Sequence, residues 1–279
     1  MPRFRLTLEY AGTRYSGWQI QKNAKTVQGE LDRAIKTVTG RHDFELYGSG
    51  RTDAGVHALA QVAHLDVSTG LPPESLLRRL NDELPTDINV LAVDVVPHRF
   101  HARHSAQARR YVYQIARRRT AFAKHYVWWV KDPLNIEAMQ AAAAAFVGMK
   151  DFQSFAEEDD ADFDTRSTLV LIDRLDVTVH GDLVIIVIQG SHFLWKMVRR
   201  IVGVLAEVGR GGLTVTAAQS MLTSRSELPA RLTAPAAGLF LERVFYQGDP
   251  RDSVVNPPTP LTAARAMPHP AAQRRADRA

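Results

Sequence analysis

The 279-residue sequence contains no cysteine. Disulfide bonds, thiolate zinc sites, iron–sulfur clusters and a cysteine nucleophile are therefore excluded. Long apolar runs are also missing, because the longest candidates, 141–149 and 183–188, fall well short of the ~18 apolar residues that a membrane-spanning helix needs. The first five residues lack the apolar stretch of a signal peptide. We therefore expect a cytoplasmic protein with no membrane partner.

The overall composition is that of a globular protein. Apolar residues make up 45% and charged residues 23% of the chain, which excludes collagen-like, low-complexity and wholly disordered proteins. At roughly 150 residues per domain, the length predicts about two domains.

Acidic residues are absent from 95–131, although this stretch is rich in arginine and lysine. A dense positive surface attracts polyanions, so the stretch favours nucleic-acid binding over a merely solvated basic face. A compensating acidic block follows, for which we expect an exposed mobile loop. Its members are Asp151, Glu157, Glu158, Asp159, Asp160, Asp162 and Asp164.

Hydrophobic periodicity predicts two α+β halves, 1–104 and 105–248, with similar order of elements. Residues 249–279 hold six prolines and no aromatic residue, which predicts a disordered tail. In the first half we expect strands at 3–10, 44–47, 61–67 and 88–96 and helices at 27–38 and 76–84, the first capped by Thr26 and ended by Gly40. In the second half we expect strands at 111–115, 170–179, 183–189 and 239–246 and helices at 135–146, 194–205 and 214–222.

The loop 48–59 carries the most unusual pattern. Its glycines let the main chain approach a ligand closely and would present Arg51, Asp53 and His57 at a mobile rim, as the loop 12–17 would display Tyr15 and Trp18. The alternative is a structural turn in which Asp53 binds nearby backbone amides. On the helix expected at 194–205, Lys196, Arg199 and Arg200 lie on one face. This face is either functional or simply solvated.

The sequence GRTDAGVH at 50–57 resembles the signature loop of the tRNA pseudouridine synthase A family. Five further blocks resemble that family in the expected order, at 15–19, 100–103, 110–113, 193–199 and 234–239. The resemblance covers residues 4 to about 247. It implies a pseudouridine synthase fold, with mixed, largely antiparallel sheets meeting at a central basic cleft, and conversion of uridine to pseudouridine at positions 38, 39 and 40 of the tRNA anticodon arm.

The resemblance also assigns roles to residues. Asp53 is implied to be the essential carboxylate, which either adds covalently to the sugar or base or removes a sugar proton, and Arg199 to be its cationic partner. Tyr111 would stack on the extruded uracil, with a half-buried strand tyrosine as its alternative, and Leu239 would line the uracil pocket, with core packing as its alternative. Arg51 would contact the RNA backbone or help to expel the base. Further candidates for substrate contact are Arg103, Arg109, Arg110 and Lys196.

The reaction neither adds nor removes atoms or electrons, so we expect no cofactor. We also expect no metal. His98, His101 and His104 recur every three residues, but Arg99 and Arg103 make a metal site there electrostatically awkward. The family relation further implies a homodimer. The alternatives are a noncatalytic tRNA-binding module or RNA chaperone, motivated by the basic stretch alone, and a nucleoside hydrolase that uses Asp53.

Overall fold

The computed structural model describes residues 1–157 and 167–259. The first half builds its elements as the hydrophobic pattern predicts. Thr26 caps the first helix by accepting a hydrogen bond from Gly29 N, and Gly40 ends it in the left-handed conformation with a φ of 65°. The elements are β1 (Arg3–Tyr10), α1 (Val27–Thr39), β2 (Glu45–Gly48), β3 (His57–Asp66), α2 (Pro73–Glu83) and β4 (Ile88–Val96).

The second half contains the predicted strands and helices in the predicted order, together with three short elements that were not predicted, at 128–129, 148–151 and 228–231. Asn135 caps the alanine-rich helix through a hydrogen bond from Ala138 N. The helix predicted to begin at 194 begins at Met197, because the residues before it form a turn that places Trp195 and Lys196 in the site described below. The elements are β5 (Ala108–Ala116), β6 (Trp128–Trp129), α3 (Ile136–Phe146), β7 (Gly148–Asp151), β8 (Leu169–His180), β9 (Leu183–Gly190), α4 (Met197–Arg210), α5 (Val215–Ser220), α6 (Leu228–Arg231) and β10 (Leu239–Phe245).

One continuous sheet connects the two halves. Within the described residues it has ten strands, in the order β4-β1-β3-β10-β5-β9-β8-β7, with β2 on β3 and β6 on β5. The pairs are antiparallel except β10 with β3 and β5 with β6. The α+β class and the mostly antiparallel pairing are confirmed, whereas the separate sheets predicted for the two halves are joined into one.

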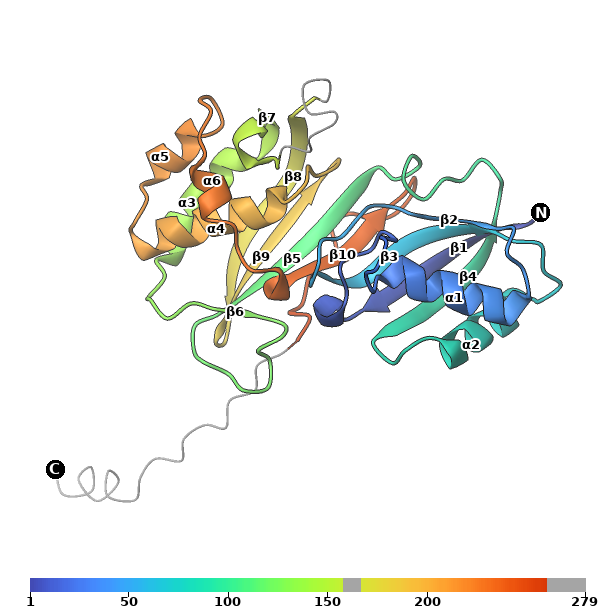
Figure 1. The fold of residues 1–279 in the computed structure, drawn as a ribbon. Helices are drawn as coiled ribbons and strands as arrows, with labels where there is room; N and C mark the ends of the chain where they lie inside the picture. The colour runs from blue at the N-terminus through green and yellow to red at the C-terminus, as the bar shows by residue number, and fades with distance from the viewer. Residues whose placement is uncertain (158–166, 260–279) are drawn as a thin grey trace, which may run out of the picture.

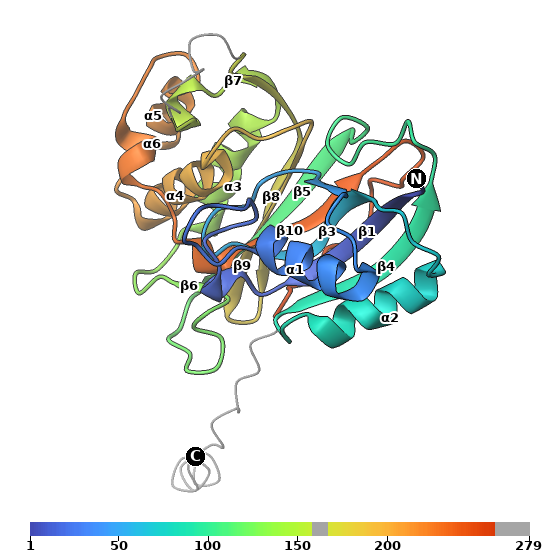
Figure 2. The same ribbon diagram turned by 45° about the vertical axis from the view of Figure 1, so that its right-hand side comes forward.

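The last strand of the chain makes that junction. In β10, Leu241 pairs with Ala58 of β3 on one side and with Tyr111 of β5 on the other. The helices α1 and α2 gather beside β1 and β4, and α3 to α6 gather beside β7 to β9, with β5 and β10 between the two groups (Figure 1; Figure 2). The strand therefore brings the segment after the glycine-rich loop next to the first strand of the second half.

Within the described residues, three clusters of buried hydrophobic residues lie along this sheet, and the two larger ones form the first and second cores. One contains Phe4, Leu6 and Leu31 with Leu241, and the other contains Tyr113, Ile201 and Leu239. We propose that the boundary between the two halves, at residues 104 and 105, separates two cores and not two sheets. The strand β10 supplies side chains to both cores and so connects the halves.

Three sequence predictions about exposure are wrong. Tyr15 and Trp18 are not displayed, since they are 3% and 1% exposed and belong to the first core. His57 begins β3 with 1% exposure, accepting a hydrogen bond from Gly12 N at 3.0 Å, so it forms no mobile rim.

The segment after β10 also differs from prediction in its described part. Residues 249–259 run back along β5, where Ser253 Oγ accepts a hydrogen bond from Arg110 at 2.6 Å and Thr259 Oγ1 accepts one from Gln114 at 2.7 Å. Residues 260–279 of the predicted disordered tail lie outside the described residues, as do residues 158–164 of the predicted acidic loop.

Candidate active site

The loop 49–56 is fixed by the segment before α1. Thr52 O accepts a hydrogen bond from Trp18 N at 3.1 Å, and Gly55 N donates to Tyr15 O at 3.2 Å. Gly17 makes this approach possible, because its φ is 94° and a Cβ there would lie 2.5 Å from Thr52 O. The loop is therefore held in one shape by the rest of the first half.

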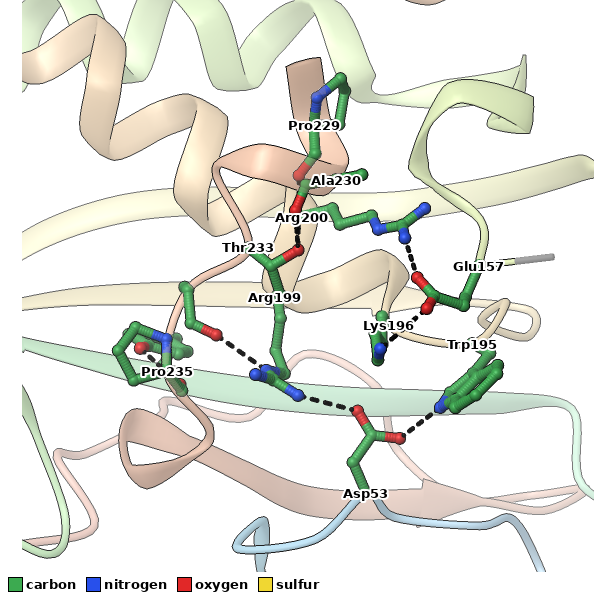
Figure 3. A network of polar contacts seen from close by, with 12 residues as sticks. Asp53, Glu157, Trp195, Lys196, Arg199, Arg200, Pro229, Ala230, Thr233 and Pro235 are labelled. Atoms are coloured by element: carbon green, nitrogen blue, oxygen red, sulfur yellow. Dashed lines mark hydrogen bonds and ion pairs between the residues drawn. The ribbon is translucent and has the colours of Figure 1, made fainter. Parts of the chain in front are cut away.

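Asp53 lies at the turn of this loop and faces the second half. Its side chain is 22% exposed, and its own carbonyl accepts a hydrogen bond from Val56 N at 3.1 Å. Its carboxylate Oδ2 lies 3.3 Å from Arg199 Nη1, and its Oδ1 lies 3.0 Å from Trp195 Nε1 (Figure 3). The carboxylate thus has one charged and one neutral donor, both from the region around the start of α4.

Arg199 is itself anchored to the segment that precedes β10. Its Nε donates to Ala234 O at 2.8 Å, while its carbonyl accepts a hydrogen bond from Ala234 N at 3.0 Å. Gly203, one turn later on α4, permits this packing, because a Cβ there would clash with Leu232 O. The backbone that Gly203 approaches is the segment 232–234, and not the Asp53 loop.

Trp195 is the residue at this site that the sequence reasoning missed. Its indole donates to Asp53 although 48% of the residue is exposed. The signal was within reach, because Trp195 belongs to the block 193–199 that also contains Arg199. Helical periodicity did not indicate Trp195, because the turn before α4 follows no apolar repeat.

An ion pair between Lys196 and Glu157 stabilises that turn. Lys196 Nζ lies 2.9 Å from Glu157 Oε1 and 4.9 Å from the centre of the Trp195 ring, and Glu157 also pairs with Arg200 (Figure 3). Lys196 was predicted to contact substrate, whereas here its charge is directed at Glu157. Arg200 is 6% exposed and likewise is not part of a solvated helix face.

Tyr111 lies on β5, close enough to Asp53 for the carboxylate charge to act on its phenol. Burial raises the pKa of its phenol to about 12, and the nearby Asp53 charge raises this pKa further while Arg109 lowers it. Its ring packs edge-on against Phe193 with centroids 5.2 Å apart. The structure therefore gathers Asp53, Arg199 and Tyr111, the three residues predicted to be catalytic.

Leu239 lies at the start of β10, opposite Tyr113, and is 4% exposed. It belongs to the second core, together with Met197 and Ile201 of α4. This position fits the packing role that was its alternative, and a role in contacting uracil stays a prediction.

The predicted phosphate-binding arginines have different environments. Arg51 and Arg103 are exposed. Arg109 donates to Ser49 O at 2.9 Å and to Arg103 O at 3.0 Å, so it connects the Asp53 loop to the chain before β5. Burial lowers the pKa of Arg109.

Arg110 contradicts its predicted role. It is fully buried, and its Nε lies 2.6 Å from Glu242 Oε2 while its guanidinium stacks on Phe245. Because strand side chains alternate between faces, adjacent Arg109 and Arg110 point to opposite sides of the sheet. Arg110 is therefore a structural ion-pair partner and not a phosphate contact.

The histidines at 98–104 contribute to structure. His101 Nδ1 accepts hydrogen bonds from Arg103 N at 3.1 Å and His104 N at 3.2 Å, and its ring packs against His64. Within residues 1–157 and 167–259, no group of three or more histidine, aspartate or glutamate side chains could hold a metal ion. The helices of those residues include none that is long and apolar enough to cross a membrane.

Known proteins match this chain over most of its length. A family model described as tRNA pseudouridine synthase matches residues 7–105 and 142–247. The chain is 43% identical to tRNA pseudouridine synthase A of Nitrobacter winogradskyi over 251 residues, which covers 89% of this chain and 97% of the relative. It is 41% identical to tRNA pseudouridine synthase A of Thermoanaerobacter pseudethanolicus over 243 residues, covering 86% and 98%.

Among solved structures, a match to a chain of the Cbf5-Nop10-Gar1 complex has 12% identity and a TM-score of 0.36, covering 74% of this chain and 45% of that one. The family assignment depends on the sequence matches, and the residues that the family model matches include the Asp53 loop and α4. The chain belongs to the tRNA pseudouridine synthase family, a family of isomerases.

Proposed function

We propose that this protein converts uridine to pseudouridine at positions 38, 39 and 40 of the tRNA anticodon arm, with Asp53 as the essential carboxylate. The observation that carries the proposal is the Asp53 carboxylate, partly exposed on a fixed loop and paired with Arg199 at 3.3 Å. The Arg199 guanidinium places a positive charge beside this carboxylate, and that charge remains when RNA displaces water from around the pair. An ionised oxygen is what either chemical route at the ribose–base junction requires.

The reaction would proceed with residues of this chain alone. The glycosidic carbon–nitrogen bond breaks, the uracil turns, and a carbon–carbon bond forms to the same ribose. The proton that the bonding carbon loses is balanced by the proton that the released nitrogen gains, so no electron acceptor or second substrate is consumed. Arg199 holds the Asp53 carboxylate, and the Tyr111 ring beside it provides a surface on which an extruded base can stack, a contact worth ~1–3 kcal/mol. Such a contact offsets part of the cost of unstacking the target nucleotide.

Exposed cations near the site would bind the RNA backbone. Arg51, two residues before Asp53, and Arg103, whose carbonyl accepts a hydrogen bond from Arg109, are the exposed predicted contacts. We expect the protein to act in the cytoplasm on transfer RNA.

The decisive experiment compares Asp53→Asn with the wild type. The variant should bind tRNA normally but form no pseudouridine, measured by mass spectrometry after chemical derivatisation. Asp94→Asn is the matched control, because Asp94 is a half-exposed carboxylate on β4 that pairs with Arg5 and should be dispensable. Near-normal product from Asp53→Asn would refute the role of Asp53.

The same assay separates the other candidate functions. Salt-sensitive tRNA binding without modified base would indicate a noncatalytic RNA-binding module, and release of free uracil would indicate a hydrolase.

We also propose a homodimer. An exposed apolar group on β7 and β8, formed by Met149, Leu169 and Leu171 on the face opposite the buried side chains of Val170 and Ile172, is a candidate contact. Light scattering of the purified protein measures its mass.

A further inference from the structure

The Asp53 carboxylate has a second donor whose role the family assignment leaves open. Oδ2 faces the Arg199 guanidinium, and Oδ1 accepts a hydrogen bond from the Trp195 indole at 3.0 Å (Figure 3). We propose that Trp195 is a positioning residue, which holds the carboxylate in the orientation that the isomerisation requires; this inference rests on the proposed function of Asp53.

Two donors on different oxygens fix an orientation that one donor leaves open. An aspartate side chain rotates about its terminal bond over a broad range of angles. The Arg199 contact at 3.3 Å restrains one oxygen, and the indole N–H restrains the other, so rotation of the carboxylate breaks both contacts. Catalysis by a positioned group is sensitive to displacements of about 1 Å, so this restraint affects the rate.

The chemistry of the donor suits this task. The indole N–H is a neutral donor with no acceptor capacity, so it binds the carboxylate without adding a charge beside Asp53. A hydrogen bond from a neutral donor is also weaker than one from a second cation. Trp195 therefore orients the carboxylate while leaving its charge to be balanced mainly by Arg199.

The turn that carries Trp195 is strained and held from several sides. Lys196 has a φ of 57°, in the left-handed region that non-glycine residues rarely adopt. Its ammonium is held by Glu157 and lies over the Trp195 ring, and Glu157 N donates to Trp195 O at 3.1 Å. Strain of this kind persists where surrounding contacts determine the conformation, and it is frequent at active sites.

Packing alone does not explain this arrangement. Trp195 is 48% exposed, in contrast to Trp18 at 1%, so the ring contributes little to a core. Its polar edge, and not its apolar face, makes the contact with Asp53. A role in stability would place the ring in the second core, beside Phe193 or Met197, which pack there.

The test replaces the donor and keeps most of the ring. With saturating tRNA, Trp195→Phe should form pseudouridine about tenfold more slowly in a single turnover, a change of about 1.4 kcal/mol in the barrier, with an unchanged dissociation constant for tRNA. Trp195→His returns an N–H donor on a smaller ring and should recover part of the rate. The matched control is Trp129→Phe on β6, where the tryptophan is 43% exposed and should be dispensable.

A spectroscopic measurement follows the contact independently of activity. The indole N–H resonance of Trp195 is identified by its absence in Trp195→Phe, and it should shift in Asp53→Ala, which removes the acceptor. The proposal is overturned if Trp195→Phe reacts at the wild-type rate or faster, if its defect lies in tRNA binding, or if the resonance does not respond to Asp53→Ala.

These outcomes are distinct from failure of the proposed function. If Asp53→Asn retains activity, Asp53 is not the essential carboxylate and the proposed function fails. If Asp53→Asn is inactive while Trp195→Phe is fully active, the function stands and the positioning role of Trp195 is wrong.

Discussion

Arg199 and Ala234 are joined by two hydrogen bonds, from Arg199 Nε to Ala234 O at 2.8 Å and from Ala234 N to Arg199 O at 3.0 Å. The pair connects the first turn of α4 to the segment that leads into β10. Because β10 also pairs with β3 and β5, the position of the guanidinium is tied to the strands that carry the Asp53 loop and Tyr111. Arg199 is thus both the cation of the site and a structural contact between its parts.

This double role predicts that lysine cannot replace Arg199. A guanidinium can serve Ala234 O and Asp53 with different nitrogens, whereas the single ammonium of lysine cannot span both. Arg199→Lys should lower the single-turnover rate roughly tenfold to a hundredfold while tRNA binding persists. Arg210→Lys at the other end of α4, where the arginine pairs with Glu207, should have little effect on the rate. A wild-type rate in Arg199→Lys would show that charge alone suffices.

Gly203→Ala should damage both stability and activity. The added Cβ would clash with the backbone at Leu232, which cannot move without displacing Ala234. Urea unfolding should show a loss of about 1–3 kcal/mol, the usual range for overpacking, and the rate should fall because Arg199 loses its anchor. Gly70→Ala is the control, since a Cβ there meets nothing within 4 Å. Equal stability of the two variants would contradict the close packing.

Acid should destabilise the protein through buried histidine. Burial lowers the pKa of His57 to about 4, and the unfolded chain restores the usual value of about 6.5. Above pH 6.5 the imidazole is neutral in the folded and the unfolded protein, so its contribution to the free energy of unfolding is fully present. This contribution is lost as the pH falls towards 4, because the unfolded state binds the proton first. Between pH 7.5 and pH 5 the expected loss from His57 is about 2 kcal/mol.

The measurement is urea unfolding at both pH values. His57→Gln should be less stable at pH 7.5 but should lose less stability on acidification. His64, whose pKa burial also lowers to about 4, keeps part of the dependence in the variant. His180→Gln, at an exposed position, should follow the wild type. An unchanged pH dependence in His57→Gln would show that this imidazole is not the group involved.

Arg110 and Arg103 should respond oppositely to replacement by alanine. Arg110→Ala leaves the Glu242 carboxylate, which is 14% exposed, without its buried partner and should cost about 3–5 kcal/mol of stability. Arg103→Ala should leave stability unchanged. It should reduce the slope of the logarithm of the tRNA binding constant against the logarithm of the salt concentration by about 0.9 per lost phosphate contact. Binding titrations at several salt concentrations, together with urea unfolding, distinguish the two. An unchanged salt slope would remove Arg103 from the RNA interface.

The sequence by itself determined the local elements and the chemistry available to the site. Alternation of Phe4, Leu6 and Leu8 specified β1, and Thr26 and Gly40 specified the ends of α1, because periodicity and capping act over a few residues. The GRTDAGVH motif pointed to Asp53 through its resemblance to the signature loop of the family, since the residues of that motif are adjacent in the chain. The same local rules could not decide that Arg109 remains near the site while Arg110 is buried against Glu242.

The tertiary structure decided which of these groups meet. Asp53 and Trp195 are 142 residues apart, and their contact depends on β10 pairing with both β3 and β5 and on the left-handed turn at Lys196. The glycines of the loop 12–17 likewise suggested a display of Tyr15 and Trp18, whereas folding buried both in the first core. Pairing between distant strands and burial depend on the whole chain, so no local pattern could specify them.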